Sequence, residues 1–146
     1  MDTKSLHAYI QGPDSKAVTD WIKSITDIER KETVDMTEET GLVIVRFHGK
    51  HESFALEQHV NTEWLELTVH PKAPDSIFAA WEDIRLGEHL VDDLGGITLV
   101  DCGGKYVDPL APFCVRISVN KMEIVELPFE IGDPFDESLT KLIKRR

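Results

Sequence analysis

Three histidines in one short stretch are the first residues whose type and spacing could do chemistry. His48 and His51 flank a predicted turn, and His59 lies on the strand expected to return from it. Three imidazoles on one hairpin could bind Zn²⁺, which takes nitrogen ligands in a tetrahedral arrangement. No cysteine or closely spaced carboxylate completes such a set. We therefore interpret these histidines as exposed side chains.

Cys102 is the one thiol with a chemically suggestive setting. It lies in the segment Asp-Cys-Gly-Gly at residues 101–104, directly after a predicted central strand, where α/β sheets often carry ligand loops. A thiolate there could be a nucleophile, but nucleophilic catalysis needs a neighbouring base, and the sequence places none. A free cysteine is more commonly a small buried apolar residue. We therefore predict no catalytic residue and no cofactor, with Cys102 as the candidate for a reactive thiol.

Acidic side chains are the most distinctive chemical feature of the chain. Its 146 residues carry 27 acids and 16 bases, a net charge of −11, and four of the bases lie in the last six residues. Residues 1–140 therefore hold 12 bases against 27 acids. Nucleic-acid binding depends on lysine and arginine neutralising phosphates, so this charge argues against a nucleic-acid partner. It favours a basic protein partner instead.

We predict that this partner binds the acidic face of one long helix. The face carries Glu82, Asp83, Asp92 and Asp93. An immunity or inhibitor protein that neutralises a basic toxin would have these properties, because charge complementarity speeds association and selects the partner. Two other interpretations remain. The acids could be ordinary solvated surface, and the chain could form a structural homodimer with no ligand.

The chain shows no sign of export or membrane insertion. Its first residues contain no apolar run of signal-peptide length, and no segment approaches the roughly 20 apolar residues that cross a bilayer. Two cysteines do not form a disulfide framework. We therefore expect a cytoplasmic protein with reduced thiols and no membrane partner.

The element expected to position the acids runs through residues 74–104. Apolar residues recur there at steps of three and four, which predicts a helix near 75–94 that begins at Pro74 and ends at two glycines. A short β-rich run at 97–100 then suits a central strand. The members of the apolar stripe are Ile77, Ala80, Ile84, Gly87, Val91 and Leu94, widened by Trp81 and Leu90.

The remaining elements follow from alternation and turn residues. A second helix is predicted near 14–26, and a short amphipathic helix at 134–146. Strands are predicted at 6–11, 29–36 (an edge strand), 42–47, 54–60, 64–70, 113–119 and 122–127. The predicted core comprises Ile10, Trp21, Ile22, Val43, Val45, Leu67, Ile84, Val91, Leu99, Val115, Ile117 and Ile124.

The order of these elements suggests one α+β domain, residues 1–146, with a mainly antiparallel sheet and two principal helices. Strand, helix and three strands occur twice, and Pro-Asp-Ser opens each helix, which suggests an internal duplication of 1–61 and 62–128. This predicted topology resembles the vicinal oxygen chelate, or glyoxalase-like, fold. The alternative is a two-layer α/β sandwich with one open sheet.

The resemblance to the glyoxalase-like fold implies a metal-dependent enzyme. Its ligands would come from the first and last strands of each unit, which carry His7, Glu57, Glu66 and Glu126, with Glu123 as an alternative to the last. Imidazole and carboxylate ligands together suit several divalent metals. However, polar residues of this kind are also expected on the solvent-exposed face of any strand in which polar and apolar residues alternate. We therefore predict no metal and keep the enzyme as an alternative function.

Overall fold

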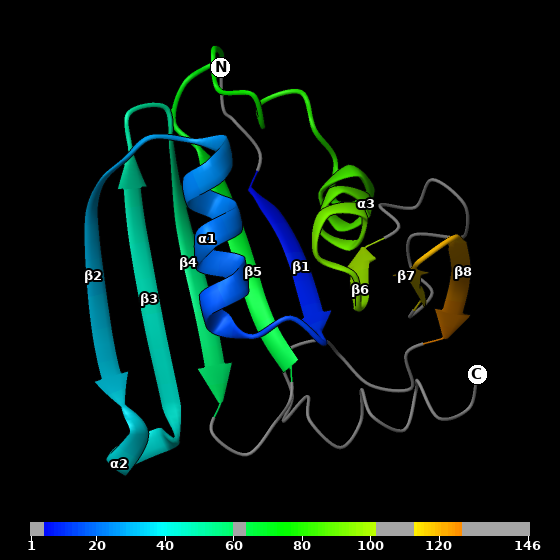
Figure 1. Cartoon of the computed structure of the whole chain (residues 1–146), viewed down its shortest axis with the longest axis horizontal. Helices are drawn as coiled ribbons and strands as arrows, with labels where there is room; N and C mark the ends of the chain where they lie inside the picture. Colours follow the sequence, from blue (N-terminus) through cyan, green and yellow to red (C-terminus); the bar gives the residue numbers. More distant parts are fainter. Residues whose placement is uncertain (1–4, 60–63, 102–112, 127–146) are drawn as a thin grey trace.

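The residues that the structure describes form one antiparallel sheet of eight strands with helices packed against it. A computed structural model describes residues 5–59, 64–101 and 113–126 (Figure 1). The strands have the order β2-β3-β4-β5-β1-β6-β7-β8. The elements are β1 Leu6–Gln11, α1 Ser15–Ile25, β2 Ile28–Met36, α2 Thr37–Thr40, β3 Leu42–Gly49, β4 Glu52–His59, β5 Trp64–Pro71, α3 Asp83–Leu94, β6 Ile97–Asp101, β7 Phe113–Ser118 and β8 Lys121–Glu126.

The first strands of the two expected halves pair with each other at the centre of the sheet. β1 lies antiparallel between β5 and β6, and β5 lies between β4 and β1. β5 of the second half therefore lies next to β4 of the first half, and β1 of the first half lies next to β6 of the second half. The prediction of an α+β fold with an antiparallel sheet and two principal helices is confirmed. The structure does not show the glyoxalase-like topology.

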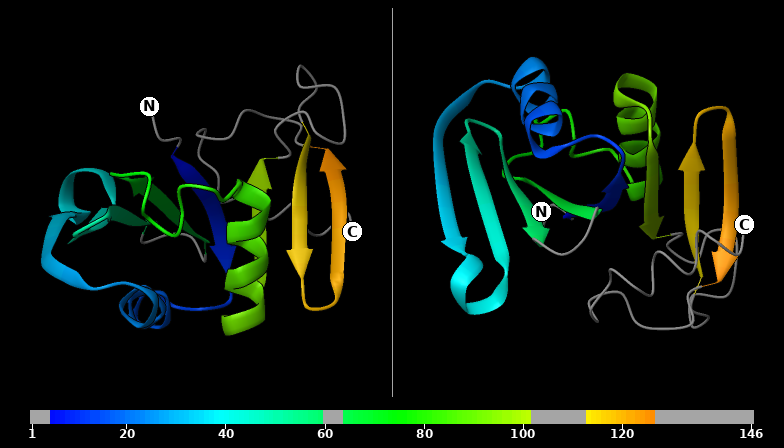
Figure 2. Two further views of the ribbon diagram at one scale, coloured as in Figure 1. Left: turned by 90° about the horizontal axis from the view of Figure 1, so that it is seen from above. Right: turned by 60° about the horizontal axis from the view of Figure 1, so that its bottom comes forward.

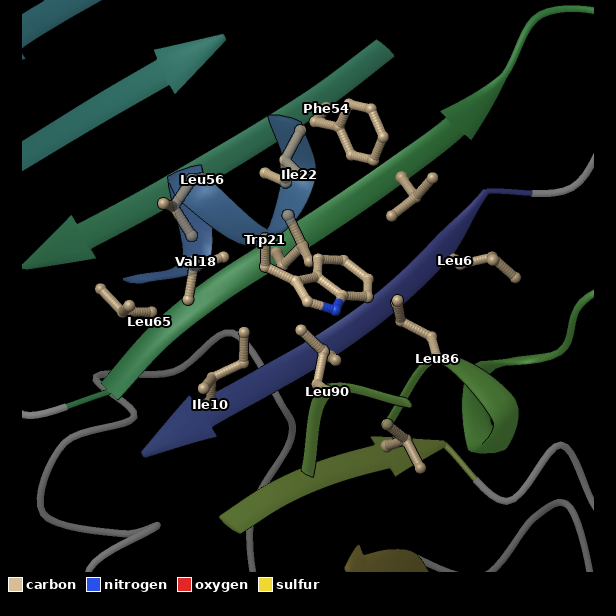
Figure 3. Packing of buried hydrophobic residues seen from close by; sticks show 14 of the residues in the cluster. Leu6, Ile10, Val18, Trp21, Ile22, Phe54, Leu56, Leu65, Leu86 and Leu90 are labelled. Carbon is tan, nitrogen blue, oxygen red and sulfur yellow. The ribbon is translucent and has the colours of Figure 1, made fainter. Parts of the chain in front are cut away.

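The main core lies between the sheet and the two long helices, α1 and α3, which share one face of it (Figures 1 and 2). α1 begins as predicted, because the side chain of Asp14 accepts a hydrogen bond from the backbone N–H of Ala17 at 2.8 Å. Figure 3 shows how side chains from both helices meet alternate residues of β1, β4 and β5. The labelled residues are Leu6, Ile10, Val18, Trp21, Ile22, Phe54, Leu56, Leu65, Leu86 and Leu90.

α3 begins eight residues later than the periodicity predicted. Residues 74–80 form turns, and the helix starts at Asp83. The hydroxyl of Ser76 accepts a hydrogen bond from the backbone N–H of Phe78, a local bond that competes with helix formation. Phe78 is fully buried, whereas Ile77, which the predicted helix placed inward, is 53% exposed. The predicted helix start at Pro74 is therefore wrong, because the turn buries a different side chain.

Most of the predicted core is buried, with exceptions near the two edges of the sheet. Val43 and Val45 on β3 are half-buried. Ile124 is 38% exposed although it lies opposite buried Val115, because it belongs to β8, the edge strand farthest from α1. The predicted residues that are buried are Ile10, Trp21, Ile22, Leu67, Ile84, Val91, Leu99, Val115 and Ile117.

A second, smaller apolar cluster lies on the sheet face opposite the helices. The register places Tyr9 of β1 opposite Leu99 of β6, and the two side chains belong to this cluster. Its other buried members are Trp64, Cys114 and Val125. Both faces of the central strands are therefore buried, which is typical of strands with nearly continuous apolar sequences.

Some predictions concern residues outside the described ranges. These are the helix at 134–146 and the Cys102 segment after Asp101. Directly after β2, residues Thr37–Thr40 form the one-turn helix α2. Within the described ranges, no helix has the length and apolar character that crossing a membrane requires.

Candidate functional site

The outer surface of α3 is the candidate functional site, and its exposed charges are mainly acidic. Glu82 precedes the helix as its N-cap residue, and Glu88 and Asp92 follow at its exposed positions. Arg85 is exposed among them, but its guanidinium carbon lies 5.0 Å from the centre of the Trp81 ring, in cation–π contact. The helix therefore presents carboxylates to solvent, while its arginine is held over an aromatic ring.

An aromatic cluster supports the start of α3. His89 stacks on Trp81 with ring centres 4.4 Å apart, and Phe78 meets Trp81 edge-on at 4.8 Å. Phe78 in turn packs edge-on against Phe54 of β4 at 5.6 Å. Such aromatic pairs add about 0.5–1.5 kcal/mol beyond the area they bury. The turn before α3 is thus fixed to the sheet, which positions the acidic surface.

Two of the four predicted partner-binding residues, Asp83 and Asp93, accept hydrogen bonds that connect α3 to other elements. Asp93 accepts a hydrogen bond from the indole N–H of Trp21 at 2.7 Å, which joins α3 to α1. Asp83 accepts from the backbone N–H of His7 at 3.1 Å, which joins α3 to β1. No sequence pattern indicated either bond, because each joins residues more than 70 positions apart. Glu88, which sequence reasoning left out, is exposed on the same helix.

Removing the Asp93 carboxylate is expected to destabilise the protein. Asp93→Ala should lower the free energy of unfolding by about 1–3 kcal/mol, because the indole N–H of Trp21 loses a charged acceptor. Asp93→Asn keeps an acceptor and should cost less. Urea unfolding of both variants measures the difference. The control is Asp92→Ala at the neighbouring position, which is also exposed but is not the acceptor of the Trp21 indole, and it is expected to change stability by less than about 0.5 kcal/mol. Equal losses for Asp92→Ala and Asp93→Ala would contradict a structural role for Asp93.

A second group of ionisable side chains lies on the opposite face of the sheet. Glu57 of β4 lies directly opposite Glu66 of β5, and Tyr9 of β1 lies directly opposite Glu66 on its other side. Burial raises the pKa of Glu66 to about 7, and the negative charge and hydrogen bond of Glu57 add to this effect. Burial also raises the pKa of Tyr9 above its usual range, with further contributions from the Glu66 and Glu57 charges.

The structure only partly assembles the residues proposed as metal ligands. Glu57 and Glu66 are cross-strand neighbours. His7 lies on the same face, two residues before Tyr9 on β1, and its Nδ1 is 3.3 Å from the hydroxyl of Thr68. Glu126 ends β8, four strand spacings from β5, or roughly 19 Å across the sheet. It therefore cannot join a ligand set with them. The side chain of Glu126 lies outside the described part of the structure.

The alternative ligand, Glu123, also belongs to β8 and already has basic partners. Its carboxylate contacts Arg116 at 3.2 Å and Lys121 at 2.9 Å. These basic side chains hold the pKa of Glu123 below its usual value, with the hydrogen bond from Lys121 as the largest cause. Among the residues that the structure describes, no three or more His, Cys, Asp or Glu side chains are arranged to hold a metal ion.

The histidines proposed for zinc pair with separate acids. His48 contacts Glu32 of β2 at 3.0 Å, and His51 contacts Asp75 at 3.2 Å. These acids lie on different elements, so the two imidazoles have different neighbours. The side chain of His48 is 28% exposed, which makes it half-buried rather than exposed as predicted. The side chain of His59 lies outside the described part.

Comparisons with known proteins do not add a function to these observations. No protein-family model matches the chain, and neither curated proteins nor solved structures give a significant match.

Proposed function

We propose that this protein is a protein-binding domain that holds a basic partner on the outer surface of α3, as an immunity or inhibitor protein would. The observation that carries this proposal is the charge of that surface. Glu82, Glu88 and Asp92 are exposed there, while Arg85 is held over the Trp81 ring. Lysines and arginines of a partner would meet three exposed carboxylates against the positive charge of Arg85.

The fold gives this surface the rigidity that recognition requires. α3 is tied to α1 by Asp93 and to β1 by Asp83, so the helix that carries the acidic surface is anchored to two other elements. A preorganised surface loses less conformational entropy on binding than a flexible one. The acidic surface would steer a basic partner during approach, and this attraction is screened beyond about 8 Å at physiological ionic strength.

Charge reversal on α3 is expected to slow partner association. The variant is Glu88→Lys with Asp92→Lys, which leaves Asp83 and Asp93 in place because both make structural hydrogen bonds. A basic partner isolated from the native cytosol at low salt should bind this variant about 10-fold more slowly or worse, since steering contributes at least that much to association rates. The rate is measured at low and high salt, and the difference should shrink as salt rises.

A matched control separates the α3 surface from net charge alone. Glu29→Lys with Glu39→Lys makes the same change in net charge on β2 and α2, at the other edge of the sheet. It should slow association much less. Equal slowing by both variants would mean that only total charge matters, and no slowing by either would remove α3 from the interaction. Circular dichroism confirms that each variant is folded.

The other functions considered have less support from the fold. A metal-dependent glyoxalase-like enzyme would draw on His7, Glu57 and Glu66, but β8 lies too far away to complete the predicted set. One form of ligand-free homodimer would hide the acidic surface of α3 against the same surface of a second copy. That arrangement would bring like charges together, which is unfavourable without intervening cations.

A further inference from the structure

The carboxyl pair in the middle of the sheet has a geometry that the proposed function does not use. Glu57 and Glu66 are directly opposed on β4 and β5, so their Cβ atoms are about 4.5–5.5 Å apart. Their side chains lie on the face opposite the helices, next to the cluster that contains fully buried Trp64 and Leu99. Two carboxylates in such a position repel each other, whereas a carboxyl and a carboxylate can share a hydrogen bond.

We propose that Glu57 and Glu66 form a proton-operated latch between β4 and β5. With one proton on the pair, the neutral carboxyl of Glu66 donates a hydrogen bond to the carboxylate of Glu57, and the two strands are held together. When that proton leaves to water, two like charges face each other across the ladder and weaken the pairing of the strands. This device lies on the opposite face of the sheet from α3 and does not depend on any partner.

The other groups facing the pair leave the repulsion between the two carboxylates largely uncompensated. From β1, Tyr9 stays protonated and neutral at physiological pH because its pKa is raised, and His7 lies one row away. From β3, Ile44 lies opposite Glu57, and the exposed Arg46 lies two residues after Ile44 on the same face of the sheet. On β6, Leu99 lies beyond Tyr9. In the described part of the chain, Arg46 is therefore the nearest cation by register.

The latch would operate in the neutral range. Burial and the charge of Glu57 raise the pKa of Glu66 from 4.5 to about 7. A carboxyl whose pKa is raised in the folded state is protonated there while the unfolded chain is ionised. The contribution of Glu66 to stability is therefore greatest below the unfolded pKa of 4.5, falls as the pH rises, and reaches its lower level once the pH exceeds about 7.

The direct test is a carboxyl titration of the full chain by NMR with ¹³C-labelled glutamate. We expect one glutamate of the wild-type protein to titrate with a midpoint near 7, and Glu57→Gln to move that midpoint toward 4.5. Glu66→Gln should raise the melting temperature at about pH 8 but leave it nearly unchanged at about pH 5, because it removes only the repulsion. Glu88→Gln, an exposed glutamate on α3, is the control and should show no such pH dependence.

Two results would overturn the latch. The first is a wild-type titration in which every glutamate carboxyl has a midpoint close to the ordinary 4.5. This measurement needs no variant, so it holds even if a substitution prevents folding. The second is a melting temperature of Glu66→Gln that differs from wild type equally at both pH values, which would indicate a packing effect rather than the loss of a titrating charge.

Discussion

Replacing Phe78 with alanine is expected to lower the free energy of unfolding by about 3–5 kcal/mol. Phe78 is fully buried, and its ring packs edge-on against both Phe54 and Trp81. Truncation would leave a cavity between the turn at 74–80 and the sheet, and it would also remove the support that Phe78 gives to the start of α3. Urea unfolding, analysed as a two-state transition, measures the loss.

The neighbouring residue provides a sharp control for the Phe78 prediction. Ile77 is 53% exposed, so Ile77→Ala should change stability by less than about 0.5 kcal/mol. A helix running from residue 75 would give the reverse result, since its apolar stripe includes Ile77 and leaves Phe78 out. A larger loss at Ile77 than at Phe78 would therefore favour the helix predicted from periodicity over the observed turn.

Replacing Gly96 with alanine is expected to cost about 2–5 kcal/mol of stability. Its φ of +78° is unfavourable by about 1–2 kcal/mol for a residue with a side chain. A Cβ atom at this position would also lie 2.4 Å from the carbonyl oxygen of Gln11 and 2.7 Å from the Cδ of Pro13. Overpacking of this kind adds about 1–3 kcal/mol. Gly96 thus allows the start of β6 to approach the end of β1.

Gly95 shows a backbone constraint without a close contact. Its φ is +76°, and a Cβ there would meet no atom within 4 Å. Its ψ of −163° places it in a region that essentially only glycine adopts, so Gly95→Ala is expected to cost about 1–3 kcal/mol from backbone strain alone. Thermal or urea unfolding measures the cost at both positions. A cost below about 1 kcal/mol for Gly96→Ala would contradict the close contact between the start of β6 and the end of β1.

Elements specified by local interactions were predictable from the sequence. The start of α1 depends on Asp14, three residues from the amide that it caps, and its buried stripe of Val18, Trp21 and Ile22 repeats within two turns. The alternation of Leu6, Ala8 and Ile10 likewise predicted β1 and its buried face. In these cases the deciding contacts lie within one element, so periodicity and capping chemistry suffice.

Predictions from periodicity alone were wrong where tertiary packing determined which side chains are buried. The stretch before α3 has the spacing of a helix, yet burying Phe78 between Phe54 and Trp81 favours a turn. Ile124 alternates correctly for a core strand, but its exposure depends on which strands the helices cover. Burial is a property of the assembled layers, and a one-dimensional pattern does not contain their order.

The candidate sites show the same division between sequence and tertiary structure. The sequence by itself determined that the chain is strongly acidic, and its periodicity predicted a helix near 75–94 that carries many of the acids, of which the structure confirms Asp83–Leu94. Only the tertiary structure decided that Asp93 bonds to Trp21 and that Glu57 faces Glu66. The physical reason is that both contacts depend on strand register and helix packing, which bring together residues on different elements. Charge and amphipathicity, in contrast, depend only on residues that are close together in the sequence.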